Sequence, residues 1–447
     1  MTIVGEYFIQ GYEMKNSSFS QSKFMTVITV VSGNFIEMYD FFLFGFYAVS
    51  ISDAFFPLQD DYASLMLTFA TFGAGFLMRP LGAIFLGSYI DRLGRRKGLL
   101  LTLGIMASGT AIVAFTPSYK SIGLIAPLVV LVGRLLQGFS AGVELGGVSV
   151  YLSEIATPGL KGLFVSWQSA SQQVAIIFCA ALGYMMGQRY SESEINDWAW
   201  RIPFFIGCMI IPLVFYIRRS LQETEAFSKQ KDHPSLKEIL NSLQKNTLII
   251  TLGMMLIVMT TVSFYLITVY TPTFGQKVLE FSSLDSLVVT LCIGVSNFIW
   301  LPIMGLLSDK IGRWPSMLVF SLLALFTAYP CLNWLVNNSS LNNMLIIELW
   351  FSFIYSGYNG ATTVALTEII PVRIRTTGFS LAYSLATALF GGFTPLISTW
   401  LIEVFDDKAA PAYWMSTAGG LAAIATVLIY GSVIKTTFRE RKGKFLG

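Results

Sequence analysis

The sequence predicts an all-α integral membrane protein with twelve transmembrane helices, built as two pseudo-symmetric bundles of six helices. Three observations support this prediction. The 447 residues are 54% hydrophobic and only 12% charged, with a mean hydropathy of +0.65, and this is about half the charge usual in soluble domains. Apolar runs of membrane-spanning length recur along the chain. A charged motif also occurs twice, about half the chain apart.

Twelve apolar runs are long enough to cross about 30 Å of hydrocarbon. Backbone polar groups in lipid must be satisfied within the segment, and the runs are too long for barrel strands, so we expect helices. The runs are centred on residues 24–51, 63–89, 98–116, 123–150, 163–188, 199–218, 247–271, 284–307, 315–335, 343–367, 377–403 and 411–434.

The repeated motif consists of a glycine, a carboxylate beside a cation, and a Gly-Arg turn. Its first copy spans Gly87–Arg96 and its second spans Gly305–Arg313, each set between two apolar runs. Internal duplication of a membrane unit is typical of secondary transporters, whose sites lie at the repeat interface. The motif therefore indicates a transporter with two related halves.

Basic residues predict the orientation of the helices. Of 29 Lys and Arg residues, 22 fall in the termini and the even-numbered connections, and five fall on the other side. By the positive-inside rule, both termini are expected in the cytoplasm. The predicted units are a cytoplasmic tail 1–23, a bundle 24–219, a cytoplasmic linker 220–246, a bundle 247–434 and a cytoplasmic tail 435–447.

Five ionisable residues fall inside predicted helices of the first half, near one level of the membrane. They are Glu37 and Asp40 in helix 1, Arg79 in helix 2, and Arg134 and Glu144 in helix 4. Such groups cost roughly 2.5–3.5 kcal/mol each to insert and usually face a cavity or a partner. A structural ion-pair network is one interpretation. The other, which we favour, assigns the arginines to an anionic substrate and the carboxylates to a proton, since a guanidinium suits a carboxylate ligand.

Neutral polar side chains recur at helical spacing and predict the rest of the site. Hydrogen bonding between helices is the alternative role for any one of them. The candidate substrate-binding residues are Asn34, Arg79, Arg134, Gln137, Gln168, Gln172, Thr261, Tyr265, Asn297, Tyr355, Asn359, Tyr383 and Ser384, and the candidate proton-coupling residues are Glu37, Asp40 and Glu144. Glu348 falls near an outer helix end, where we expect it to contact water.

Several function classes are disfavoured. The Gly138–Gly142 segment fits a hydrolase Gly-x-Ser-x-Gly pattern, but it lies within a predicted helix and the only histidine, His233, lies in the linker. The four cysteines are scattered singly, without metal-ligand spacing. The net charge of +3 follows from the orientation bias and indicates no nucleic-acid partner. We expect a transporter, with no enzyme activity and no metal site.

The motifs match a known family. The paired Gly-x-x-x-Asp-Arg/Lys-x-Gly-Arg segments resemble the signature of the major facilitator superfamily, as do Arg134-Leu-Leu-Gln137-Gly138, Glu154–Pro158 and Glu368–Pro371. Within it, Ser32–Phe41 resembles the helix 1 signature of the metabolite–proton symporters. The longer stretches, such as Ser166–Gln173 and Gly378–Thr387, are similar to the bacterial citrate and tricarballylate proton symporters.

The resemblance implies import of citrate or a related tricarboxylate with protons, by alternating access, and no cofactor beyond the proton. It also implies a multi-pass protein of the bacterial inner membrane with a monomeric functional unit. The family's gating motif covers Gly87, Asp91, Arg92, Gly94, Arg95, Asp309, Lys310, Gly312 and Arg313. Two alternatives remain: a symporter of the same family for shikimate, 2-oxoglutarate or a zwitterionic osmolyte, and a proton-coupled exporter. Exporters usually carry a Gly-Pro motif in helix 5, and residues 163–188 contain no proline.

Overall fold

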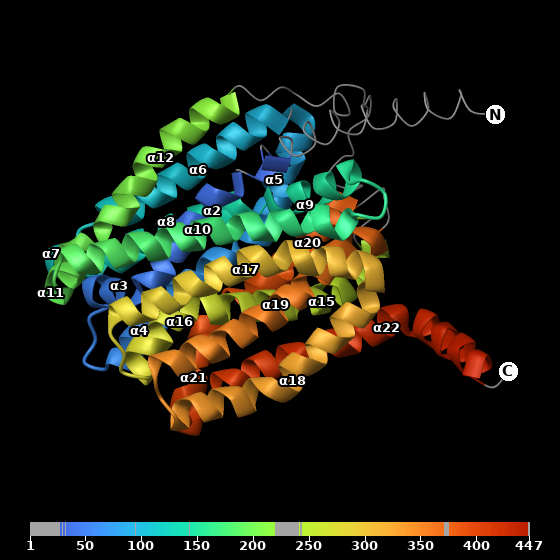
Figure 1. The fold of residues 1–447 in the computed structure, drawn as a ribbon. Coiled ribbons are helices and arrows are strands. Elements are labelled where there is room, and N and C mark those ends of the chain that lie inside the picture. Colours follow the sequence, from blue (N-terminus) through green and yellow to red (C-terminus); the bar gives the residue numbers. More distant parts are fainter. Residues whose placement is uncertain are drawn as a thin grey trace, which may run out of the picture.

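The structure is a computed structural model that describes residues 27–28, 30–31, 33–93, 95–142, 144–219, 241, 244–370 and 375–445. The side chains of residues 36, 87–100, 144, 213–214, 216–219, 376 and 432–445 are outside this description, as are most of the predicted linker and the predicted N-terminal tail. The described residues form helices joined by short connections, and most of the helices run roughly along one common direction (Figure 1).

The first half contains the elements from α2 to α12. They are α2 (Gly33–Phe46), α3 (Ala48–Phe55), α4 (Asp61–Leu77), α5 (Arg79–Leu93), α6 (Arg95–Phe115), α7 (Tyr119–Ile122), α8 (Ile125–Ala141), α9 (Glu144–Ile155), α10 (Lys161–Arg189), α11 (Glu192–Glu194), the π-helix η1 (Ile195–Ala199) and α12 (Arg201–Arg219).

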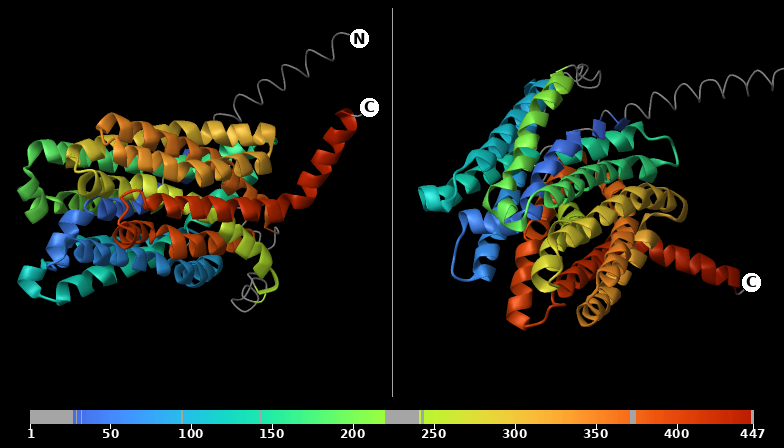
Figure 2. Two further views of the ribbon diagram at one scale, coloured as in Figure 1. Left: turned by 90° about the horizontal axis from the view of Figure 1, so that it is seen from below. Right: turned by 60° about the vertical axis from the view of Figure 1, so that its left-hand side comes forward.

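The second half contains the elements from α15 to α22. They are α15 (Thr247–Tyr265), η2 (Leu266–Tyr270), α16 (Thr271–Thr273), η3 (Phe274–Val278), α17 (Ser283–Ile311), α18 (Arg313–Asn337), α19 (Leu341–Ile369), α20 (Arg375–Ala386), η5 (Thr387–Gly391), α21 (Thr394–Phe405) and α22 (Pro411–Phe445). The last helix continues through most of the predicted C-terminal tail and projects beyond the bundle (Figure 2).

Eight helical stretches of the described residues are long and apolar enough to cross a membrane, and two shorter apolar helices accompany them. The predicted helices 1 and 10 fall outside that set. Both carry polar side chains in their interior, among them Glu37 and Asp40 on α2 and Glu348 and Asn359 on α19. Their lower hydropathy therefore reflects polar residues that the bundle buries, and the twelve-helix prediction agrees with the helices found.

Four predicted helices are interrupted rather than continuous. Helix 2 divides at Met78, between α4 and α5. The cause is Pro80, since a proline ring clashes with the carbonyl four residues earlier and removes one helical hydrogen bond. Helix 1 divides at Tyr47, between α2 and α3, and helices 7 and 11 contain π-helical turns near Pro272 and Pro395. Such irregular turns are frequent at functional sites.

The two halves meet where α10, the fifth predicted helix of the first half, lies beside α17, the second predicted helix of the second half (Figure 1). Near Gly162 and Gly305 the two backbones touch, because a Cβ atom on Gly305 would lie 2.5 Å from the Gly162 carbonyl oxygen. We call this end of the bundle, which carries the second motif, the motif end.

At the far end, which carries Asp61 and Lys277, the halves also touch. The Tyr270 ring of the second half lies 6.1 Å from the Phe69 ring of the first half. A Cβ atom on Gly45 would lie 2.3 Å from the Val269 side chain. The described residues thus hold the halves together at both ends.

Candidate functional site

An ion pair joins two of the predicted residues in the middle of the first half. Arg79 Nη2 lies 3.3 Å from Glu37 Oε1, and both side chains are at most 2% exposed. Arg79 occupies the first position of α5, directly after the break in helix 2. The break therefore places a guanidinium at the level of the helix 1 carboxylates.

A second network surrounds Asp40, one turn further along α2. Asp40 Oδ2 accepts hydrogen bonds from the Thr110 hydroxyl and, at 2.8 Å, from Gln137 Nε2. Gln137 in turn accepts a 2.6 Å hydrogen bond from Arg134 Nη1. All four side chains are buried. Gln137 thus links the Asp40 carboxylate to the Arg134 guanidinium without direct contact between the two charges.

Aromatic rings cover both guanidinium groups. Arg79 Cζ lies 4.7 Å from the ring centroid of Phe41, and Arg134 Cζ lies 4.6 Å from the same centroid. Three more rings complete the cover: Phe76 on Arg79, and Phe44 and Phe72 on Arg134. A desolvated cation over an aromatic face gains roughly 0.5–2 kcal/mol, so these rings help to hold two buried positive charges without water.

Several buried N–H donors around this cluster have no hydrogen-bond acceptor among the described residues. They are Nε and Nη2 of Arg134, Nε of Arg79, and the side-chain Nε2 atoms of Gln168 and Gln172. Asn34 bonds the same helix α10, since its Nδ2 donates to the backbone carbonyl of Gln168 at 3.3 Å and to Ser171 Oγ at 3.1 Å. Unsatisfied buried donors are costly. Their concentration here fits a ligand that brings several acceptor oxygens.

The second half contributes phenols to the same region. The Tyr265 hydroxyl lies within electrostatic range of both buried arginines, and that of Tyr383 lies within range of Arg79 and Glu37. Tyr355 lies within electrostatic range of Tyr265 and Tyr383, and it receives a 3.3 Å hydrogen bond from Asn359 Nδ2. Two further predicted residues of this half are Thr261, whose hydroxyl bonds carbonyls of its own helix, and Ser384, which is 5% exposed.

Asn297 is engaged elsewhere. Its Oδ1 accepts hydrogen bonds from Ser352 and Ser356 at 2.8 and 3.1 Å. Its Nδ2 donates to Gln173 Oε1 at 3.2 Å across the boundary between the halves. In this structure Asn297 therefore joins α17, α19 and α10, and its substrate-binding role stays a prediction.

One expectation was wrong. Glu348 is 5% exposed and does not contact water as its position near an outer helix end suggested. The irregular segment of helix 7 covers it, because the Thr271 hydroxyl lies 3.3 Å from Glu348 Oε1. The predicted Glu144 side chain and the first motif copy at Gly87, Asp91, Arg92, Gly94 and Arg95 lie outside the described side chains.

The second motif copy binds the other half. Asp309 accepts hydrogen bonds from the backbone N–H groups of Gly162 and Leu163, and it pairs with Arg313 at 2.8 Å. Arg313 reaches Glu368 at 3.2 Å. Gly312 has φ +94°, a backbone conformation that a side chain would strain. The motif therefore ties α17 to the first turn of α10 at the motif end.

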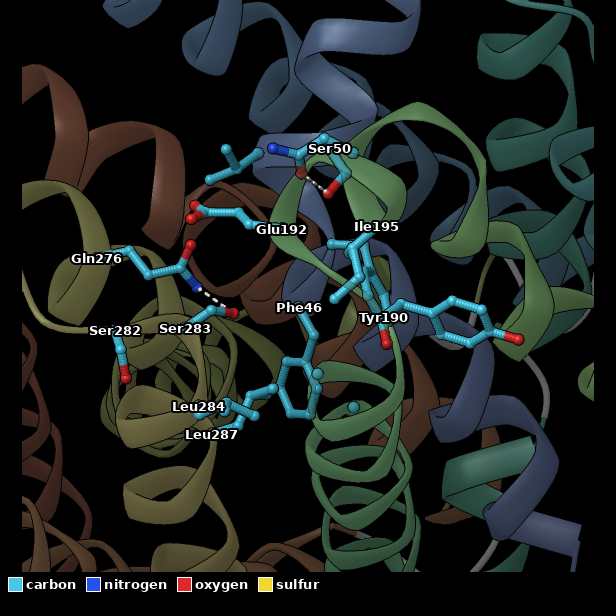
Figure 3. Close-up of a pocket in the computed structure, with 15 residues that line it drawn as sticks. Phe46, Ser50, Tyr190, Glu192, Ile195, Gln276, Ser282, Ser283, Leu284 and Leu287 are labelled. Carbon is cyan, nitrogen blue, oxygen red and sulfur yellow. Dashed lines mark hydrogen bonds between the residues drawn. The ribbon is translucent and has the colours of Figure 1, made fainter.

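A cavity of about 190 Å³ opens between the halves at the far end (Figure 3). Phe46, Leu284 and Leu287 form its apolar side, and Glu192 and Gln276 lie on its polar side. It contains none of the buried charges described above. We interpret it as the space where the halves separate at that end, distinct from the central cluster.

Sequence reasoning did not identify several residues of the site. Thr110 of α6 bonds Asp40, but a single threonine in an apolar helix gives no periodic signal. Phe41, Phe44, Phe72 and Phe76 were indistinguishable from ordinary core residues. The one available signal was the aromatic run Phe41–Phe46, which directly follows the helix 1 carboxylates.

The chain is similar to known transporters in sequence and in fold. Residues 25–442 match the family model described as sugar (and other) transporter. The citrate-proton symporter of Salmonella typhi is 59% identical over 408 residues, covering 91% of this chain and 94% of that protein. The citrate-proton symporter of Klebsiella pneumoniae is 58% identical, covering 90% of this chain and 91% of that protein. Among solved structures, the xylose transporter XylE from E. coli in a partially occluded inward open conformation superposes with a TM-score of 0.72 at 18% identity, covering 91% of this chain and 96% of that one.

Proposed function

This chain belongs to the family of sugar and other transporters, and on that premise we propose that it is a proton-coupled symporter that imports citrate or a related tricarboxylate by alternating access. Family membership makes it a multi-pass membrane transporter and not an enzyme. The two relatives that share well over half of its residues are citrate-proton symporters, which supports the substrate class.

The main support for the proposal comes from the two buried arginines. Two guanidinium groups, of Arg79 and Arg134, lie buried around the Phe41 ring with N–H groups that lack acceptors among the described residues. Guanidinium forks bind carboxylates with paired hydrogen bonds. The amides of Gln168 and Gln172 add further unsatisfied donors. A substrate with several carboxylates would supply the missing acceptors.

The charge balance suggests how protons enter the cycle. In this structure Glu37 offsets Arg79, and Asp40 reaches Arg134 through Gln137. Each proton bound by one of these carboxylates leaves one guanidinium charge free to bind a substrate carboxylate. Proton binding and anion binding therefore favour each other, which is the requirement for symport.

We further propose the orientation and the units. The motif end faces the cytoplasm together with both termini, in the bacterial inner membrane, and the bundles 24–219 and 247–434 of one monomer rock against each other around the central cluster. The contacts at both ends support a closed state between the inward and outward forms, in keeping with the alternating access of such transporters.

Uptake of radiolabelled citrate into proteoliposomes tests the function. We expect uphill accumulation with a proton gradient directed inward, and none without it. Unlabelled tricarballylate should compete, whereas shikimate, 2-oxoglutarate and glycine betaine should compete weakly. Strong competition by one of these three would identify another substrate of the same mechanism. Citrate efflux driven by the opposite gradient, without uptake, would contradict import.

A further inference from the structure

We propose that Glu348 is a further proton-binding group of the transport cycle, and that its protonation closes the far end of the transporter through Thr271. This proposal rests on the proposed proton-coupled function. It concerns the second half of the chain, whereas Glu37 and Asp40 belong to the first half.

Burial is the first reason. Glu348 lies on α19 and is 5% exposed, and no Lys or Arg lies within ion-pair distance of it among the described residues. Its Oε2 atom is buried without a hydrogen-bond partner among those residues. Burial of an ionised carboxylate without a cation is strongly unfavourable, so this position suits the neutral acid.

The one polar contact of the Glu348 side chain among the described residues gives the second reason. The Thr271 hydroxyl carries one hydrogen, and the Ile267 carbonyl oxygen lies 2.8 Å from its oxygen, nearer than Glu348 Oε1 at 3.3 Å. When the Thr271 hydroxyl donates its hydrogen to the Ile267 carbonyl, its contact with Glu348 is a hydrogen bond only if a protonated Glu348 carboxyl donates to the Thr271 oxygen. The geometry therefore fits a protonated Glu348.

The location of Thr271 links this proton to closure. Thr271 begins α16, the short helix between the π-helical turns η2 and η3. This irregular segment seals the far end, because Val269 packs on Gly45 and the Tyr270 ring lies 6.1 Å from Phe69. Glu348 lies directly behind it. When the segment moves away as the far end opens, water reaches the carboxyl and allows it to ionise.

Other charged groups on the neighbouring elements have partners or lie at helix ends. Lys277 of η3 lies 4.0 Å from Asp61, and Asp285 of α17 bonds Ser282. The remaining charged groups with described side chains on the elements packed against α19 are Glu154 of α9, Lys161 and Arg189 of α10, Asp309 and Lys310 of α17, Arg313 of α18 and Arg375 of α20. These groups lie at helix ends, whereas Glu348 contacts the segment Leu266–Val278 directly. We therefore assign the effect of pH on this segment to Glu348.

The test measures closure of the far end against pH, without substrate. Spin labels at Leu58→Cys and Lys408→Cys, in a background whose four native cysteines are alanine and which remains folded and helical, report the distance between the halves at that end. In proteoliposomes we expect the short-distance population to grow at least tenfold relative to the long one between pH 8.5 and pH 5.5. Glu348→Gln, a neutral mimic, should stay short at every pH.

Two more variants provide a second test of the proposal and a control. Thr271→Val removes the hydrogen-bond acceptor but keeps the carboxyl, so the midpoint of the pH dependence should move to lower pH. Glu403→Gln changes an exposed carboxylate of α21 and should leave the curve unchanged. If the Glu348→Gln protein closes with the same pH dependence as the parent protein, the proposal is wrong. If Glu348→Gln does not fold, an unshifted midpoint in Thr271→Val contradicts the proposal instead. The distance measurement uses no citrate, so its result does not depend on the outcome of the citrate uptake assay.

Discussion

The carboxylate of Asp309 on α17 accepts a 2.8 Å hydrogen bond from the backbone N–H of Gly162, at the start of α10 in the other half. The first N–H groups of a helix have no partner within it and carry the positive end of its dipole. A buried carboxylate at this point therefore satisfies two of them, counting Leu163, and adds a favourable charge interaction. The second motif copy acts as a clasp between the halves.

Replacement of Asp309 by asparagine should loosen this clasp. Charge-assisted hydrogen bonds contribute roughly 1.5–3 kcal/mol, so we expect the population closed at the motif end to fall about tenfold or more. Equilibrium citrate binding should survive, while turnover falls. Asp285→Asn is the matched control, because it lies on the same helix at the far end. Complete loss of citrate binding in a folded Asp309→Asn protein would show that Asp309 supports the binding site itself. Asp91→Asn tests the first copy in the same way.

Contact between the two backbones predicts a steric effect at the same end. A Cβ atom on Gly305 would lie 2.5 Å from the Gly162 carbonyl oxygen and 2.7 Å from Ser166 Oγ. Overpacking of this kind costs roughly 1–3 kcal/mol, so Gly305→Ala should favour the form open at the motif end. Accessibility of that end to a thiol reagent should increase. Gly147→Ala, where a Cβ atom meets no other atom within 4 Å, should leave accessibility unchanged.

Much of the fold could be read from the sequence because its physical cause is local. Apolar length dictates the membrane helices, and the repeated motif indicates the two halves. The sequence also predicted that Glu37, Asp40, Arg79 and Arg134 lie close together, since charged groups within a membrane usually face a partner or a cavity. It did not predict which of them pair. The pairing depends on the break at Met78 and on Gln137, which places an amide between Asp40 and Arg134.

The sequence did not predict which side chains are buried by segments that are distant along the chain. Glu348 lies only two turns from the start of α19, and position along a helix alone suggests contact with water. The irregular segment of helix 7 covers it, and Thr271 is 77 residues away in sequence. Thr110 was missed for the same reason, since its role arises only when α6 packs beside α2 and α8.

The two buried arginines should not tolerate replacement by lysine. Arg79→Lys and Arg134→Lys keep a positive charge but lose the planar fork, which pairs with carboxylates and stacks on Phe41. We expect citrate affinity to fall about 10- to 100-fold in each, as measured by isothermal titration calorimetry. Arg201→Lys is the control, because Arg201 bonds the carbonyls of Ala114 and Thr116 away from the central cluster. Citrate affinity near that of the parent in both variants would remove the arginines from the binding site.

The helix 1 carboxylates should carry the coupling proton. Asn at position 40 or Gln at position 37 imitates the protonated acid, so Asp40→Asn or Glu37→Gln should retain citrate exchange but lose accumulation driven by the proton gradient. Asp40 is the stronger candidate. Its carboxylate reaches Arg134 only through the amide of Gln137, whereas Glu37 directly neutralises Arg79, so protonation of Asp40 breaks no ion pair. In the coupling variant the exchange rate should depend less steeply on pH between about 5.5 and 8 than in the parent protein, because one titrating group is gone. Asp53→Asn, which changes an exposed carboxylate of α3, should behave like the parent. Uphill accumulation with unchanged pH dependence in both single variants would place the coupling site outside helix 1.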